Sequence, residues 1–258
     1  MMTRILLSVL LLLVSVPAKS VGPTPDLYKS MEVQDARGKT LPRDHTLHDG
    51  QGNERSLKDW MNNNKPTLLT FNYLGCPMLC GLQQEGLAQS IRDLKLRAGH
   101  DFEILTISID PKETDEALTQ AAERLGTKVE SDWTVLRASQ DTVDALTGLA
   151  GFPFKWVEET KQFAHPAVTY VLTDEGTISQ YFTAVQPNSR DLNYALIEAS
   201  NGTVGSLLDQ ITLTCLQYDL SSNTYVARNV MQAGGYVILG GVVMLLFTLW
   251  RRELPRWR

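Results

Sequence analysis

The feature that most constrains the fold is an alternation between short apolar runs and longer stretches of helical periodicity. Runs rich in strand-forming residues occupy positions 67–74, 102–109, 133–136, 168–173 and 177–182. Segments with helical spacing occupy positions 83–97, 113–125, 142–149 and 189–200. Asp174, Glu175 and Gly176, between the last two runs, predict a hairpin. After a small β entry, the expected order is β-α-β-α-β-α-β-β-α, which predicts an α/β domain.

The N-terminal segment is typical of a secretory signal peptide. Arg4 precedes an apolar run over residues 5–16, and small residues surround Ala18. This layout predicts that residues 1–20 are a signal peptide, cleaved after Ala18 or Ser20. The alternative is an uncleaved anchor, although the run is shorter than the roughly 20 apolar residues that span a bilayer.

The C-terminal segment has the pattern of a membrane span. Residues 233–250 carry no charge and have about the length of a membrane-spanning helix. The residues after them, 251–258, contain four arginines, and positive charge is typical of the cytoplasmic side of a span. We therefore expect a single C-terminal transmembrane helix, with residues 251–258 as a basic cytoplasmic tail. The domain at residues 30–220 would then lie on the periplasmic side of the membrane.

Two of the three cysteines lie close together between a predicted strand and a predicted helix. Cys76 and Cys80 occur in G-C-P-M-L-C-G, where Pro77 suits the first position of a helix. Cys76 would cap this helix, and Cys80 would lie one turn inside it on the same face. The partial positive charge of a helix N-terminus favours thiolates there. Such sulfurs can form a structural disulfide, exchange a disulfide with a partner or bind a soft metal, although thiol exchange usually uses two intervening residues.

Metal binding needs a further ligand, and His165 is the candidate among the four histidines. It lies in K-Q-F-A-H-P-A-V, before the predicted strand at residues 168–173. In a thioredoxin-like domain, the loop before this strand lies beside the cysteine-bearing helix. Two thiolates and one imidazole suit Cu(I) and can also hold Cu(II), whereas structural zinc normally has four protein ligands. The alternative is that His165 is an ordinary surface residue of a loop.

These motifs together resemble the Sco (SenC/PrrC) family of copper chaperones for cytochrome c oxidase assembly. The resemblance covers about residues 40–194 and rests on F-N-Y-L-G-C-P-M-L-C, on S-I-D-P at residues 108–111 and on the spacing of His165 from the cysteines. It implies a thioredoxin-like fold that binds one copper ion through Cys76, Cys80 and His165. The chain departs from the family in its C-terminal anchor and in Pro166, where the family often has a small polar residue.

The resemblance implies a copper-binding chaperone that delivers copper to, or prepares, the dinuclear copper site of cytochrome c oxidase subunit II. A thiol reductant or another copper carrier would be a further partner, and the membrane would be the site of attachment. The alternative is a membrane-anchored thiol–disulfide oxidoreductase that uses Cys76 and Cys80 as a redox pair. A peroxide-consuming relative has the least support, because the segment before Cys76 lacks the P-x-x-x-T/S-x-x-C arrangement. The net charge of -5 argues against a nucleic-acid partner.

Two more residues have alternative interpretations. Asp110, in S-I-D-P, could orient a metal ligand from outside the ligand set, or it could serve with Pro111 as a helix N-cap pair. Cys215 has no partner near it in the sequence, so we expect a buried, inert thiol.

Overall fold

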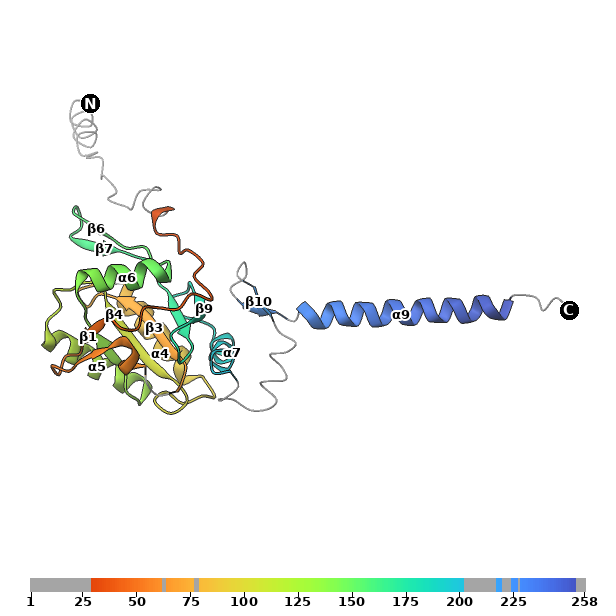
Figure 1. Ribbon diagram of the computed structural model, residues 1–258, viewed down its shortest axis with the longest axis horizontal. Coiled ribbons are helices and arrows are strands. Elements are labelled where there is room, and N and C mark those ends of the chain that lie inside the picture. The colour runs from red at the N-terminus through yellow and green to blue at the C-terminus, as the bar shows by residue number, and fades with distance from the viewer. Residues whose placement is uncertain are drawn as a thin grey trace, which may run out of the picture.

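A five-stranded sheet forms the centre of the domain (Figure 1). The computed structural model describes residues 29–61, 64–76, 79–201, 217–219, 224–226 and 228–253. In spatial order, the strands are β5 (Thr134–Leu136), β4 (Glu103–Ser108), β3 (Thr67–Asn72), β8 (Thr169–Leu172) and β9 (Ile178–Phe182). The first three are parallel to one another, whereas β8 is antiparallel to both β3 and β9. The predicted α/β, thioredoxin-like fold class is confirmed, and so is the hairpin between β8 and β9.

Helices cover both faces of the sheet, because the side chains of a buried strand alternate between two cores. The helices are α4 (Leu79–Arg92), α5 (Asp115–Val129), α6 (Gln140–Ala150) and α7 (Ser189–Ala199). On β3, Leu69 and Phe71 belong to the core that α6 covers, whereas Leu68 belongs to the core shared by α4, α5 and α7. All of β3 is buried, which explains the unbroken apolar run in the sequence.

Short polar residues determine where these helices begin. The side chains of Thr114, Ser139 and Asn188 accept hydrogen bonds from first-turn N–H groups of α5, α6 and α7. At the end of α6, Gly151 adopts a left-handed φ of 64°. A Cβ at this position would lie 2.3 Å from the carbonyl oxygen of Gln34, so both the conformation and the close approach require glycine.

A small N-terminal hairpin extends the edge of the sheet. It consists of β1 (Thr46–His48) and β2 (Glu54–Ser56), followed by the short helix α3 (Leu57–Trp60). His48 and Arg137 exchange two backbone hydrogen bonds of 2.9 Å, which join the hairpin to the chain just after β5. This arrangement confirms the small β entry and the turn that the sequence predicts before the main sheet.

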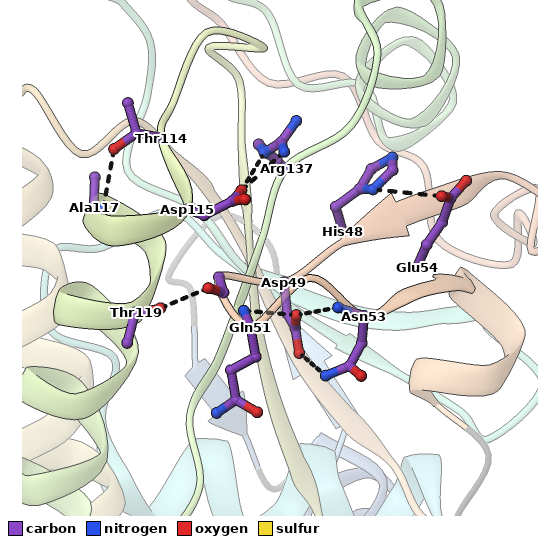
Figure 2. Close-up of polar contacts among 11 residues, drawn as sticks. His48, Asp49, Gln51, Asn53, Glu54, Thr114, Asp115, Ala117, Thr119 and Arg137 are labelled. Carbon is purple, nitrogen blue, oxygen red and sulfur yellow. Dashed lines mark hydrogen bonds and ion pairs between the residues drawn. The ribbon is translucent and has the colours of Figure 1, made fainter.

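The connection between β1 and β2 is a tightly hydrogen-bonded turn, residues 49–53, which we call the edge turn. One oxygen of Asp49 accepts from the backbone N–H groups of Gln51 and Asn53 at 2.9 and 2.8 Å, and the other accepts from the Asn53 amide at 2.7 Å (Figure 2). The Thr119 hydroxyl of α5 donates to the carbonyl oxygen of Gly50 at 2.9 Å. The edge turn is therefore fixed both internally and against α5.

A second hairpin precedes β8, and no pattern in the sequence predicts it. Its strands are β6 (Lys155–Val157) and β7 (Gln162–Ala164). Phe163 packs edge-on against Trp156, with ring centroids 5.0 Å apart, and against Tyr73 at 5.3 Å. The hairpin thus brings the chain that follows β7 to the end of β3.

The structure describes the predicted C-terminal segment but not the predicted N-terminal one. Residues 233–250 lie within α9 (Arg228–Glu253), a helix of 26 residues that projects away from the domain (Figure 1). Among the described residues, however, no helix combines the length and the apolar character that crossing a membrane requires. The predicted span therefore has no support from the structure. The predicted signal peptide, Cys215 and the end of the basic tail lie outside the described residues.

Candidate metal centre

The two cysteines lie at the connection between β3 and α4. After β3, residues 73–76 form a short connection, and α4 begins at Leu79, so Cys80 lies in its first turn. The backbone N–H of Cys80 donates to the sulfur of Cys76 at 3.3 Å, which places Cys76 at the start of the helix as a capping acceptor. The two residues are not joined in a disulfide. Pro77 and Met78 lie outside the described residues.

His165 reaches the same point from the other side of β3. It follows β7 and precedes β8, and its Nε2 lies 3.0 Å from the Cys80 sulfur. The potential ligand atoms of Cys76, Cys80 and His165 all lie within 4.8 Å of one another. The structure therefore brings together the three residues that the sequence singled out, at distances from which one ion could contact all of them.

The hydrogen bonds of His165 define which ring nitrogen carries a proton. Nδ1 lies 3.0 Å from the carbonyl oxygen of Pro166, and a carbonyl oxygen can only accept, so Nδ1 carries the hydrogen. Burial lowers the pKa of His165, which favours the neutral ring. Nε2 is then unprotonated and accepts from the Cys80 S–H. Pro166, which departs from the family pattern, thus supplies the oxygen that orients the ring for ligation.

The surroundings of Cys80 are apolar. Cys80 and His165 are 3% and 7% exposed, and the rings of Tyr73 and Phe152 lie 5.9 and 5.8 Å from the His165 ring. Burial, together with the neighbouring Cys76, raises the pKa of the Cys80 thiol. The expectation that the helix N-terminus favours a thiolate is therefore wrong for Cys80 in the metal-free protein, because burial and the neighbouring Cys76 outweigh the backbone hydrogen bonds that favour the thiolate. A soft cation that replaces the S–H proton would remove this obstacle.

Asp110 forms part of a local turn. Its side chain accepts from the backbone N–H of Lys112 at 2.9 Å, and its own N–H donates to the Ser108 hydroxyl at 3.1 Å. The N-cap of α5 is Thr114, so the interpretation of Asp110 as a helix cap is wrong. The role of Asp110 in orienting a ligand stays a prediction.

Two residues that no sequence motif singles out connect the ligand-bearing segments to neighbouring elements. Glu113 accepts from the backbone N–H of Leu74, two residues before Cys76, at 2.6 Å. Gln83, on α4, donates from its side-chain amide to the carbonyl oxygen of Val168 at 2.9 Å. Both bonds join a side chain to a backbone group distant in the sequence, and no local pattern predicts such a pairing.

Comparisons with known proteins identify the family and the fold that this chain resembles. A family model described as SCO1/SenC matches residues 33–198. The crystal structure of a putative electron transfer protein from Aquifex aeolicus VF5 is 30% identical, with a TM-score of 0.58, and covers 65% of this chain and 96% of that chain. ScoI from Arabidopsis thaliana with copper bound is 17% identical, with a TM-score of 0.50, and covers 61% of this chain and 96% of that chain, a likeness of fold alone. A search of the curated proteins gives no match.

The match to the family model spans the central sheet and all three residues of the candidate centre. It extends from Val33, before the first hairpin, to Glu198 in α7. The resemblance that the cysteine motif, the S-I-D-P motif and the spaced histidine predict is thereby confirmed: the chain belongs to the SCO1/SenC family.

Proposed function

We propose that this protein binds one copper ion through Cys76, Cys80 and His165 and acts as a copper chaperone in cytochrome c oxidase assembly. The observation that carries the proposal is the convergence of two sulfurs and an unprotonated imidazole nitrogen within 4.8 Å. Soft thiolate ligands favour Cu(I), and imidazole is compatible with either oxidation state of copper. A relative of the same fold, ScoI from Arabidopsis thaliana, is described with copper bound.

The charge and burial of the centre favour a monovalent, weakly hydrated ion. Two thiolates and a neutral imidazole carry a charge of about -2, so Cu(I) leaves one negative charge and Cu(II) leaves none. Because Cys80 and His165 are almost fully buried, a strongly hydrated cation would lose most of its water on entry. Binding also releases the proton that Cys80 shares with His165, so copper affinity should decrease as the solution becomes more acidic.

Family membership and the sequence support a proposal for the recipient and the location. We assign the dinuclear copper site of cytochrome c oxidase subunit II as the recipient, with a thiol reductant or another copper carrier as a further partner. Residues 1–20 as a signal peptide and residues 233–250 as a periplasm-facing anchor stay predictions. Fractionation of cells that express the full chain, or a chain that ends before residue 233, tests the C-terminal anchor, because only the full chain should stay with the membrane after washing at high pH. The N-terminal residue of the purified protein tests whether the signal peptide is cleaved.

The test of copper binding is a competition experiment on the reduced protein. The wild-type protein should retain one Cu(I) against a chelator, and His165→Ala should lower the affinity by more than about a hundredfold, the upper end of what an indirect contact contributes. Gln84→Met is the matched control, because Gln84 is also buried on α4 but contacts Arg124 instead of the centre. If the reduced wild-type protein takes up no Cu(I), the proposal fails.

A second candidate function, thiol–disulfide exchange, has one observation in its favour. Cys76 is only half-buried, so a partner disulfide can reach its sulfur while Cys80 stays inside. In such a reaction Cys76 attacks the partner disulfide, and Cys80 then forms the Cys76–Cys80 disulfide and releases the partner as a dithiol, a transfer of two electrons and two protons. His165→Ala separates the functions, because a reductase would keep its activity on a model disulfide while a chaperone would lose copper.

A further inference from the structure

Gln83 is a fully buried polar residue one turn after Cys80 on α4. Residues three apart lie on the same face of a helix, so the side chains of Cys80 and Gln83 are directed toward the same part of the domain. The Gln83 amide nitrogen lies 2.9 Å from the Val168 carbonyl oxygen. Since a carbonyl oxygen only accepts, this contact fixes the orientation of the amide, with its NH₂ group toward Val168.

The hydrogen bond acts on the segment that carries His165. The ladder between β3 and β8 ends at the pair Thr70–Thr169, so residues 165–168 lie beyond the last paired position. His165 is at one end of this segment, and among the described residues its hydrogen bond to α4 is the one to Cys80, at 3.0 Å. Gln83 holds the other end to the same helix. The two bonds therefore join one helix to both ends of a four-residue segment.

The choice of a polar residue at this position has an energetic cost. Gln83 is 0% exposed, and its amide oxygen has no hydrogen-bond partner among the described residues. A buried acceptor without a partner is unfavourable, and an apolar side chain of similar volume would avoid that loss. The neighbouring Gln84 differs, because its amide oxygen accepts from Arg124 at 3.1 Å. The hydrogen bond from Gln83 to the Val168 carbonyl oxygen offsets part of this unfavourable burial.

We infer that Gln83 is a positioning residue that sets the place of His165 relative to Cys80 by holding the Val168 carbonyl to α4. The inference rests on the proposed function, in which His165 is a ligand. Without this bond, the Cys80–His165 contact is the one hydrogen bond between the described residues of α4 and residues 165–168. His165 then samples positions away from the sulfurs, and the fraction of molecules ready to bind the ion decreases.

The experiment compares Gln83→Met with Gln84→Met, each alone and combined with His165→Ala, in the reduced full chain. Gln83→Met should lower the Cu(I) affinity about tenfold, as is typical for partners that orient a metal ligand. Gln84→Met should leave the affinity unchanged. In the His165→Ala background, Gln83→Met should have no further effect, because the ligand that it positions is absent.

A measurement without copper supports or overturns the inference independently. The ¹⁵N resonances of the His165 ring in the metal-free protein should show one tautomer in the wild type and in Gln84→Met, and averaging or broadening in Gln83→Met. Equal affinity and equal ring spectra in Gln83→Met and wild type would overturn the inference. An equal loss of affinity with and without His165 would also overturn it, since Gln83 would then act on the fold as a whole. If the wild type takes up no Cu(I), the proposed function fails, and the ring spectra still decide the role of Gln83.

Discussion

Two carboxylates that accept backbone N–H groups lie in different regions of the molecule, and their pKa values shift in opposite directions. Asp49 closes the edge turn, where burial is outweighed by hydrogen bonds from Asn53 and Gln51, so its pKa is lowered (Figure 2). Glu113 holds the connection between β3 and α4, where burial, aided by the nearby Asp110 charge, outweighs hydrogen bonds from Leu74 and Gly75, so its pKa is raised. The same type of bond thus has a different electrostatic result at the two places.

The difference reflects how each region keeps its shape. The edge turn is stabilised by the hydrogen bonds of Asp49 and Thr119. Beside it, a partly exposed ion pair between Arg137 and Asp115 joins the chain after β5 to α5, and water can partly screen that attraction. The candidate centre is stabilised by close packing of aromatic rings around His165, with few but buried polar bonds. We therefore expect changes near the centre to have larger effects on stability than changes at the edge turn.

The largest effect should come from the aromatic packing at the centre. Phe152 is 3% exposed and lies 5.2 Å from the Phe71 ring and 5.8 Å from the His165 ring. Phe152→Ala should lower the free energy of unfolding by about 3–5 kcal/mol, because it removes these contacts and leaves a cavity. Denaturant unfolding of the metal-free protein measures this loss. A loss below about 1 kcal/mol would contradict the view that packing holds the centre.

Removal of the Glu113 carboxylate should have the next largest effect. Glu113→Ala leaves the N–H of Leu74, now bonded at 2.6 Å, without its acceptor. We expect a loss of about 1–3 kcal/mol in the free energy of unfolding, the range for a buried donor left without its partner. Lys112→Ala, at the exposed neighbouring position, is the control and should stay within about 0.5 kcal/mol of the wild type.

The opposite pKa shifts predict opposite pH profiles for two amide variants. The Asp49 contribution is present above its unfolded pKa of 3.8 and is lost as the pH falls through the lowered folded value. The Glu113 contribution is present below its unfolded pKa of 4.5 and is lost as the pH rises through the raised folded value. Relative to wild type, Asp49→Asn should therefore gain stability as the pH falls, and Glu113→Gln should gain stability as the pH rises.

Unfolding curves between pH 3 and pH 7 measure both profiles. Each single group can change the slope by at most about 1.4 kcal/mol per pH unit, which limits the size of either effect. Slopes of the same sign in the two variants would show that burial does not distinguish the two carboxylates, and the comparison between the regions would fail.

The sequence predicts the three residues of the candidate centre better than it predicts the hairpin and the hydrogen bonds that surround them. Local patterns in the sequence predict the buried strand β3 and the helix after it. The family resemblance predicts the three ligand residues, and the structure brings their side chains together. The β6–β7 hairpin leaves no such pattern, because its residues are half-exposed or exposed and carry several charges. Glu113 and Gln83 contact backbone groups of distant segments. Because any residue type carries such backbone groups, the sequence gives no sign of these pairings. The raised pKa of Cys80 depends on burial that only tertiary packing creates.

The smallest expected effect belongs to the ion pair between Arg137 and Asp115, beside the edge turn. Arg137 lies 2.8 Å from Asp115, but the two side chains are 31% and 49% exposed, so water and salt screen their attraction. Arg137→Ala should lower the free energy of unfolding by less than about 1 kcal/mol, and the loss should shrink further in high salt. The Arg137 backbone would still exchange its two bonds with His48, so the hairpin keeps its place beside β5. A loss above about 2 kcal/mol, independent of salt, would mean that this region relies on buried interactions as much as the centre does.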